Sequence, residues 1–308
     1  MKTLSLDALQ IFKTVVEEGG INRAAAKLHR VQSNVTTRVK QLEEQLGTPL
    51  FLRQGRGLAL SAEGKVLLGY ADRLLRLSSE AASALSRGTP RGTLKLGTLE
   101  STAAARLPPV LSRYHRDCPE VSIELATGTS GALVARLLNY EIEAAFVAEP
   151  FAAGRGVEMQ HVFTEELVLI TPASVGRIRS AKDIGRRTVI AFAAGCSYRR
   201  RLEQWLGLEK VVPERVMEFA SYHAIVACVA AGAGIAVVPR SIISAVLKEK
   251  EVTVHPLPSA VSRARTQLIW RAGHSASALQ ALRAQLALRP QASRPSRAAT
   301  RVVAHLKA

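Results

Sequence analysis

The stretch VQSNVTTRVKQLEEQLG, residues 31–47, decides the fold of the N-terminal part of the chain. Its apolar residues recur at the spacing of one narrow helical face: Val35, Val39, Leu42 and Leu46. Ser33, Thr37 and Lys40 lie on the opposite face of the same helix. Such a helix buries one side and presents short polar side chains and a cation on the other, which suits the major groove of DNA.

The residues before this stretch predict two more helices. The first runs from about Leu6 to Glu18 and ends at Gly19-Gly20, because three apolar residues share one face: Leu9, Phe12 and Val16. We expect Asn22 to cap a short second helix from Arg23 to Leu28, whose alanines allow close packing. A short turn separates this helix from the next one, so the pair predicts a helix-turn-helix.

The residues after the stretch predict a hairpin. Leu50–Leu52 and Leu58–Leu60 are short extended runs on either side of a basic, glycine-bent tip at residues 53–57. Such a hairpin is a wing that can lie along a phosphate backbone or in the minor groove.

Ser61 is expected to cap a long helix from about Ala62 to Arg87. Its seam has the spacing of a coiled coil: Leu67, Ala71, Leu74, Ser78, Ala81 and Leu85. We infer that this seam joins two copies of the chain. The alternative is a helix that packs on its own domain.

Composition indicates a globular protein with a polyanionic partner. The chain has 308 residues, 47% of them hydrophobic, and a formal net charge of +17. The region 252–308 contributes nine basic residues and no acid, so over half of the net charge comes from the C-terminal fifth of the chain, which ends in a basic tail at 291–308. No apolar run is long enough for a membrane span, and no signal peptide is expected. Three widely spaced cysteines suit a reducing cytoplasm.

Glycine-bearing residues 88–92 separate a helical half from a mixed half. Beyond them, short apolar runs predict strands at 94–98, 121–127, 144–148, 167–171, 188–192, 235–238 and 267–270. Helical patterns lie between them at 103–116, 131–140, 198–206, 222–231, 241–247 and 276–288. This alternation predicts an α/β fold with largely parallel sheets.

The run INRAAAKLHRVQSNVTTRVKQLEEQLGTPLFLRQGRGLALSAEGKVLL, residues 21–68, resembles the N-terminal domain of LysR-type transcriptional regulators. The matching signals are AA before KL, Q-S-x-V-T at the start of the recognition helix, LEEQLG at its end, PLFLR and L-x-L-S-x-x-G. The resemblance is close over residues 1–88 and looser over 92–290. It implies an all-α winged helix-turn-helix domain at 1–61 and a dimerisation helix and hinge at 62–91.

The resemblance also assigns the residues expected to meet DNA. It places four at base edges and three near phosphates or the minor groove: Gln32, Ser33, Thr36 and Thr37, then Arg38, Arg53 and Arg56. The chemistry fits, because a Gln amide can bind adenine in two places and a Thr offers a hydroxyl or a methyl group. The chain departs from the family's pattern at two points. Val31 replaces the usual Ser or Thr cap, and Thr37 stands where a basic residue is common.

For residues 92–290 the resemblance implies an effector-binding domain similar to periplasmic binding proteins. Its two α/β subdomains would cover about 92–163 with 265–290, and about 164–264, with a small molecule held in the cleft between them. Ligands of α/β sheets lie at the carboxyl ends of strands, facing helix starts. That rule selects Ser101, Thr102, Thr129, Cys196, Ser197 and Ser221.

Hydroxyl groups and free backbone N–H groups at helix starts suit a carboxylate-like effector. The alternative is that these residues only cap their helices. Glu100 argues against a doubly anionic ligand unless it faces away.

The sequence therefore predicts a cytoplasmic DNA-binding transcriptional regulator controlled by a small molecule. Its partners would be double-stranded DNA, the effector and further copies of itself, as a dimer through the long helix and a tetramer by family resemblance. The main alternative is a solute-binding protein. No metal site or cofactor is expected, and an enzyme is disfavoured because no catalytic motif occurs and Cys196 has no histidine near it in sequence.

Overall fold

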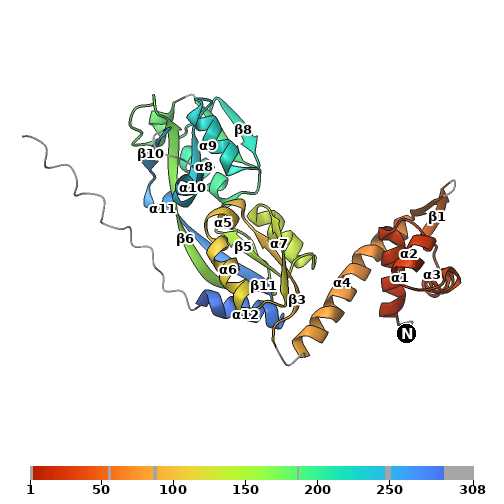
Figure 1. Ribbon diagram of the computed structural model, residues 1–308. Helices are drawn as coiled ribbons and strands as arrows, with labels where there is room; N and C mark the ends of the chain where they lie inside the picture. Colours follow the sequence, from red (N-terminus) through yellow and green to blue (C-terminus); the bar gives the residue numbers. More distant parts are fainter. Residues whose placement is uncertain (1–2, 55–56, 86–88, 186, 247–250, 288–308) are drawn as a thin grey trace, which may run out of the picture. The chain divides into compact units, whose positions relative to one another are not determined.

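A computed structural model describes residues 3–54, 57–85, 89–185, 187–246 and 251–287 (Figure 1). Arg56 and the tail at 291–308 lie outside the described residues, as does the side chain of Arg53. The chain forms two compact units. The first consists of Met1–Leu99, Glu120–Met159 and Ile269–Leu279, and the second of Glu100–Pro119, Gln160–Leu268 and Gln280–Ala308. These units divide the chain differently from the predicted domains and subdomains, whose boundaries stay predictions.

The first unit begins with three helices: α1 (Leu6–Glu17), α2 (Ile21–Lys27) and α3 (Gln32–Leu46). The cap predicted for α2 is wrong, because Gly20 is the N-cap and Asn22 lies inside the helix. Val31 caps α3 without a side-chain hydrogen bond, as its apolar side chain requires. Gly47 ends α3 with φ of 73°, a left-handed conformation that glycine adopts without steric cost.

Two clusters of apolar side chains hold these helices together. One contains Leu9, Phe12 and Leu42, and the other contains Val35 and Val39 with residues of α1 and α2. Leu46, the fourth residue of the predicted stripe, is instead 37% exposed. The apolar face of α3 therefore narrows toward its C-terminal end.

The predicted wing forms from β1 (Phe51–Gln54) and β2 (Gly57–Leu60), which pair antiparallel. Phe51 begins the wing and also packs on Phe12, with ring centroids 5.4 Å apart. Ser61 caps the next helix, α4 (Ala62–Leu85), because its hydroxyl oxygen accepts a hydrogen bond of 2.8 Å from the Gly64 N–H group. This cap was predicted.

The seam predicted for α4 is only partly available to a second copy of the chain. Leu67 and Ala71 are buried in the core that α1 and α3 share. The prediction of a dimer seam is therefore wrong at these two residues, where α4 packs on its own domain. Lys13 of α1 also forms an ion pair of 2.7 Å with Asp72 of α4. The exposed large apolar residues of α4 include Val66, Tyr70, Leu74 and Leu77, of which Leu74 belongs to the predicted seam.

The rest of the first unit is an α/β layer. Strand β3 (Gly92–Thr98) pairs in parallel with β4 (Val121–Thr127) and with β5 (Ala144–Ala148). In the strand order, β11 (Arg263–Arg271) follows β5. Helix α7 (Ser130–Leu138) connects β4 to β5, and α12 (Ser277–Ala287) begins in this unit. The parallel arrangement predicted from the sequence is confirmed for these strands.

The second unit is less parallel than predicted. Strand β6 (Val157–Pro172) pairs antiparallel with β9 (Ala236–Pro239) and with β10 (Val252–Pro256). A separate parallel pair consists of β7 (Thr188–Phe192) and β8 (Arg215–Phe219). Strands β8 and β10 were not predicted. The reason is visible in β8, where polar Arg215 and Glu218 interrupt the apolar pattern.

Helices of the second unit follow the predicted positions, except that one predicted helix is divided and two short segments, at Ser259–Ser262 and Ala181–Ile184, were not predicted. The helix predicted at 103–116 is divided into α5 (Glu100–Ala105) and α6 (Leu107–Asp117), because Pro108 and Pro109 begin a new first turn. The others are α8 (Ser197–Leu208), α9 (Tyr222–Ala230), α10 (Arg240–Val246), α11 (Ser259–Ser262) and a 3-10 turn at Ala181–Ile184. Among the described residues, no helix combines the length and the apolar character needed to cross a bilayer.

Two glycines of α4 allow a matched test of this packing. A Cβ atom on Gly64 would lie 2.3 Å from the Leu50 carbonyl oxygen, whereas one on Gly69 would meet nothing within 4 Å. We expect Gly64→Ala to lower the free energy of unfolding by about 1–3 kcal/mol through overpacking. Gly69→Ala should raise it by up to about 1 kcal/mol, because alanine is the better helix former. Calorimetry on the full chain measures both, and equal effects would contradict the packing described.

Candidate DNA-binding and effector sites

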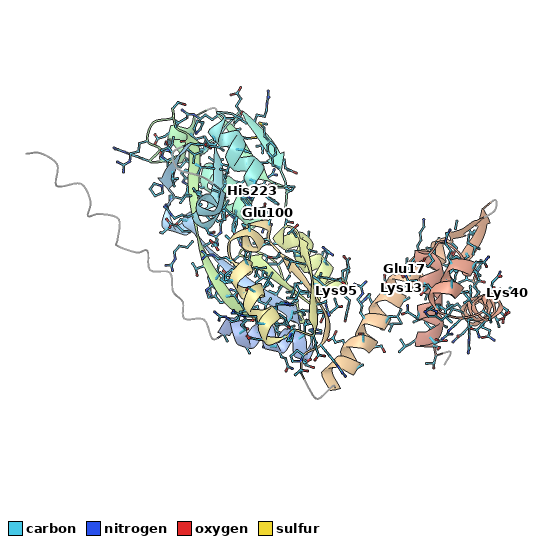
Figure 2. The ribbon with its side chains drawn as sticks, in the orientation of Figure 1. Lys13, Glu17, Lys40, Lys95, Glu100 and His223 are labelled. Carbon is cyan, nitrogen blue, oxygen red and sulfur yellow. The ribbon has the colours of Figure 1, made fainter. Side chains whose placement is uncertain are left out.

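The outer face of α3 presents the residues predicted to read bases. Gln32, Ser33, Thr37 and Arg38 are all exposed. Lys40 is exposed on the same helix, where Figure 2 labels it. Val35, Val39 and Leu42 are buried on the other side of the helix.

Thr36 differs from its neighbours on α3. It is half-buried, and its hydroxyl group donates a hydrogen bond of 2.9 Å to the Gln32 carbonyl oxygen. The hydroxyl proton is therefore already used within the helix. What Thr36 can still offer a base is its oxygen lone pairs and its methyl group.

Several cations near α3 are already paired with acids. Arg30 forms two hydrogen bonds with Asp7, of 2.7 and 3.1 Å, and this pairing lowers the pKa of Asp7. Lys27 lies 2.6 Å from Glu18. Within the described part of the chain, Arg38 and Lys40 form no ion pair, so they are the cations of α3 that can meet phosphates without first breaking a contact.

Glu43 connects the recognition helix to the wing, a role that the sequence pattern did not reveal. Its carboxylate accepts hydrogen bonds from the backbone N–H groups of Leu50, at 2.7 Å, and Phe51, at 3.2 Å. The neighbouring Glu44 is exposed. Two adjacent acids look alike in sequence, and only the path of the chain after Gly47 distinguishes them.

In the second unit, Ser101 and Thr102 lie buried at the start of α5. The buried phenol of Tyr198 lies near the hydroxyl groups of Ser101 and Thr266. Burial raises the pKa of Tyr198, and the hydroxyl groups of Ser101 and Thr266 offset only part of that effect. None of these three hydroxyl groups has a well-formed hydrogen bond within the described residues. Tyr198 and Thr266 were not among the predicted residues.

Two arginines of this region, Arg106 and Arg199, are already paired with acids. Arg106 makes two hydrogen bonds with buried Glu165, of 2.5 and 3.0 Å, and the Ser241 hydroxyl group donates another of 2.8 Å to the same carboxylate. Arg199 of α8 pairs with Glu203 and Glu218. An anion bound beside α5 and α8 would therefore rely on hydroxyl and backbone N–H groups.

Cys196 and Ser197 lie buried at the start of α8. The Cys196 sulfur atom is 3.8 Å from the Tyr222 hydroxyl oxygen, and burial raises the pKa of the thiol. A protonated, buried thiol is a poor nucleophile, which disfavours a catalytic role for Cys196, and its place in an effector pocket stays a prediction. Ser221 is half-buried and precedes α9 without capping it through its side chain.

Glu100 and His223 come together in the second unit (Figure 2). The Glu100 carboxylate accepts a hydrogen bond of 3.3 Å from the Tyr222 N–H group and lies 3.9 Å from the His223 ring. Burial raises the pKa of Glu100, and the Tyr222 N–H group and His223 offset part of that effect.

Thr129 belongs to the first unit, where its side chain accepts a hydrogen bond of 3.4 Å from the Ala132 N–H group. This is the ordinary capping role that was the alternative for all the predicted effector residues. Among the described residues, no group of His, Cys, Asp or Glu side chains is placed to hold a metal ion.

Comparisons with known proteins match both the helix-turn-helix region and the α/β region of the chain. Residues 6–65 match the family described as bacterial regulatory helix-turn-helix protein, lysR family. Residues 87–291 match the LysR substrate binding domain. The chain is 40% identical to the uncharacterized HTH-type transcriptional regulator YusT of Bacillus subtilis (strain 168), over 85% of this chain and 88% of the relative. It is 38% identical to the transcriptional regulator GltR of the same organism, over 87% and 90%.

Solved structures show the same fold. A full-length OxyR variant from Pseudomonas aeruginosa gives a TM-score of 0.69 at 21% identity, covering 93% of this chain and 95% of the other. CbnR, solved in complex with its target DNA, gives 0.66 at 23% identity, covering 92% and 99%. With both family models matched in order and curated relatives aligned over most of its length, the chain belongs to the LysR family of transcriptional regulators.

Proposed function

We propose that this LysR-type regulator recognises a dyad-symmetric DNA site with α3. We also propose that its binding to DNA changes when a small carboxylate-like molecule binds its effector domain. The observation that carries the first half is the two-faced character of α3. Val35 and Val39 fix the helix in the core, and Gln32 and Thr37 face outward. The CbnR complex, with the same fold, contains target DNA, which supports DNA as the partner here.

Two copies of the chain would present two recognition helices to successive turns of one DNA face. The exposed stripe of α4, Val66, Tyr70, Leu74 and Leu77, supports a dimer through that helix, because exposed apolar side chains at helical spacing favour a partner helix. We infer that such dimers pair into a tetramer. The protein would then work in the cytoplasm, where the DNA is.

The effector half of the proposal rests on the hydroxyl groups of Ser101, Tyr198 and Thr266. These groups are buried, and each retains hydrogen-bonding capacity that a ligand could use. Thr102, Ser197 and Ser221 belong to the same second unit. Effector binding would change the angle between the subdomains or between the dimers and thereby alter how the DNA is bent.

Family membership excludes the alternative of a solute-binding protein with no regulatory role. The relatives are transcriptional regulators, so the chain is not an enzyme.

Base reading by α3 can be tested with three variants. Gln32→Ala and Thr36→Ala should each weaken specific DNA binding by about 1–3 kcal/mol, the usual contribution of a base contact. Gln41→Ala changes an exposed residue of the same helix that is not assigned to a base, and it should bind normally. Gel-shift titrations with specific and random competitor measure the difference. Retained specificity in the first two variants would refute the assignment.

The link between α3 and the wing can be tested with two adjacent acids. Glu43→Ala should reduce DNA affinity and lower the salt dependence of binding, because a displaced wing loses phosphate contacts and each contact contributes about 0.9 to the slope against log salt. Glu44→Ala removes the same charge from an exposed site and should leave the wing in place. If both variants change the slope equally, charge and not wing position is responsible.

The effector class can be tested by thermal shift on the full chain. Small aliphatic and aromatic carboxylates are compared with the corresponding amides, which keep the shape and lose the charge. A bound carboxylate at 100 times its dissociation constant adds about 2.7 kcal/mol of stability. Ser101→Ala and Ser197→Ala should reduce this gain, and Ser122→Ala, at an exposed site, should not. Equal stabilisation by amides would contradict a carboxylate-like effector.

A further inference from the structure

A partly buried group of charged side chains around buried His274 joins α4 to the α/β layer of the first unit. We call Glu80, Glu143, Arg271 and His274 the α4 joint. The His274 side chain is 1% exposed, and each of its ring nitrogens faces a carboxylate. Nδ1 contacts Glu80 Oε1 from α4, and Nε2 lies 3.1 Å from Glu143 Oε2, which precedes β5.

Arg271, at the end of β11, completes the joint. Its guanidinium lies 3.3 Å from Glu80 Oε2 and donates hydrogen bonds of 2.9 and 2.8 Å to the carbonyl oxygens of Leu137 and Ile142. The same guanidinium lies 4.3 Å from the centroid of the Tyr140 ring. A second cation, Arg73 of α4, lies 5.2 Å from that centroid. Tyr140 is thus contacted by cations from both sides of the joint.

The joint is polar where a docked helix would ordinarily be held by apolar packing. Beside it, α4 and the turn after α7 border a groove of about 400 Å³, whose lining includes Arg73, Arg76, Asn139 and Glu141. At this point of α4, Glu80 contacts both Arg271 and His274 of the α/β layer.

The protonation state of His274 decides whether those contacts can form. A neutral imidazole has one N–H donor and one lone pair, whereas the imidazolium has two donors. Only the charged ring presents an N–H group to Glu80 and to Glu143 at the same time. A neutral ring would leave a lone pair facing a carboxylate and would leave the buried group with two anions and one cation.

We propose that His274 is a proton-dependent clasp that holds α4 against the α/β layer, so that the attachment of the helix bearing the DNA-binding domain depends on pH. The groups that face the ring are Glu80 from α4, Glu143 before β5, and Arg271 from β11 through Glu80. The other oxygen of Glu143 accepts a hydrogen bond of 3.1 Å from the Lys95 N–H group of β3. The clasp operates without the effector.

The direction of the pH dependence follows from the environment of the ring. Burial lowers the pKa of His274, but the hydrogen bonds and charges of Glu143 and Glu80 outweigh that effect, and the pKa is raised overall. A raised pKa means that docking is fully stabilised below the ordinary histidine pKa of about 6.5. The stabilisation is lost as the pH rises through the raised pKa of the docked state.

The first test measures the pKa of His274 directly. Histidine ring signals of the full chain are followed by NMR from pH 5 to pH 9, and the His274 signal is assigned by its loss in His274→Gln. We expect His274 to titrate above the ordinary histidine pKa of about 6.5. Glu80→Gln should lower the pKa of His274, and Glu63→Gln, at an exposed site of the same helix, should not. A His274 pKa that Glu80→Gln leaves unchanged would overturn the proposal.

The second test measures the attachment of α4. Amide hydrogen exchange of residues 76–82, corrected for the intrinsic pH dependence of exchange, should show less protection at high pH than at low pH. In His274→Gln, whose side chain stays neutral, protection at low pH should fall roughly tenfold, the equivalent of one charge-assisted hydrogen bond. His115→Gln should behave as the parent does. Protection that is independent of pH and of His274 would show that the group is a passive contact.

Discussion

The burial of one face of α3 is the constraint on which the DNA-binding surface depends. Val35, Val39 and Leu42 are each at most 5% exposed, and burial of side chains of this size contributes about 1.5–3 kcal/mol apiece. These contacts fix the rotation of α3 about its own axis. The helix cannot turn its polar face inward without losing them, so the outward position of Gln32 and Thr37 is a consequence of the core.

The N-terminal domain extends this constraint to its other elements through a few specific contacts. Glu43 of α3 accepts hydrogen bonds from the backbone at the start of the wing, which fixes the wing relative to α3. Phe51 of the wing packs on Phe12 in the core. The ion pair between Lys13 and Asp72 joins α1 to α4. Helix α3, the wing and α4 are therefore joined by direct contacts, which connect α4 to the surface proposed to meet DNA.

In the second unit the organising feature is charge neutralisation. Arg106 and Glu165 satisfy one another, as do Arg199 and its two acidic partners, so these buried or half-buried charges are compensated. What stays available is a set of neutral hydroxyl groups around Tyr198. The α4 joint differs from this arrangement, because its charges balance only when His274 is protonated. A regulator with both features would have one region that can bind a small molecule and another whose contacts depend on the protonation of a histidine.

The amino-acid sequence by itself determined the elements whose signals are local. The periodicity of Val35 and Val39 predicted α3, Ser61 marked the start of α4, and the apolar run at Ala144–Ala148 predicted β5, because each pattern reflects the geometry of its own backbone. The family motifs added the domain plan and the DNA partner. The exposed and polar strand β8 escaped prediction, since its apolar pattern is interrupted.

Only the tertiary structure decided which face of α4 is buried, because Leu67 and Ala71 satisfy the same spacing rule as a dimer seam and yet meet α1 and α3 of their own domain. It also distinguished Glu43 from Glu44 and brought Glu80, Glu143 and His274 together from positions far apart in the chain. Spacing along a sequence constrains neighbours within one helix or strand. It carries no information about side chains that meet after the chain has folded back, and the contacts of Glu43 and His274 are of that kind.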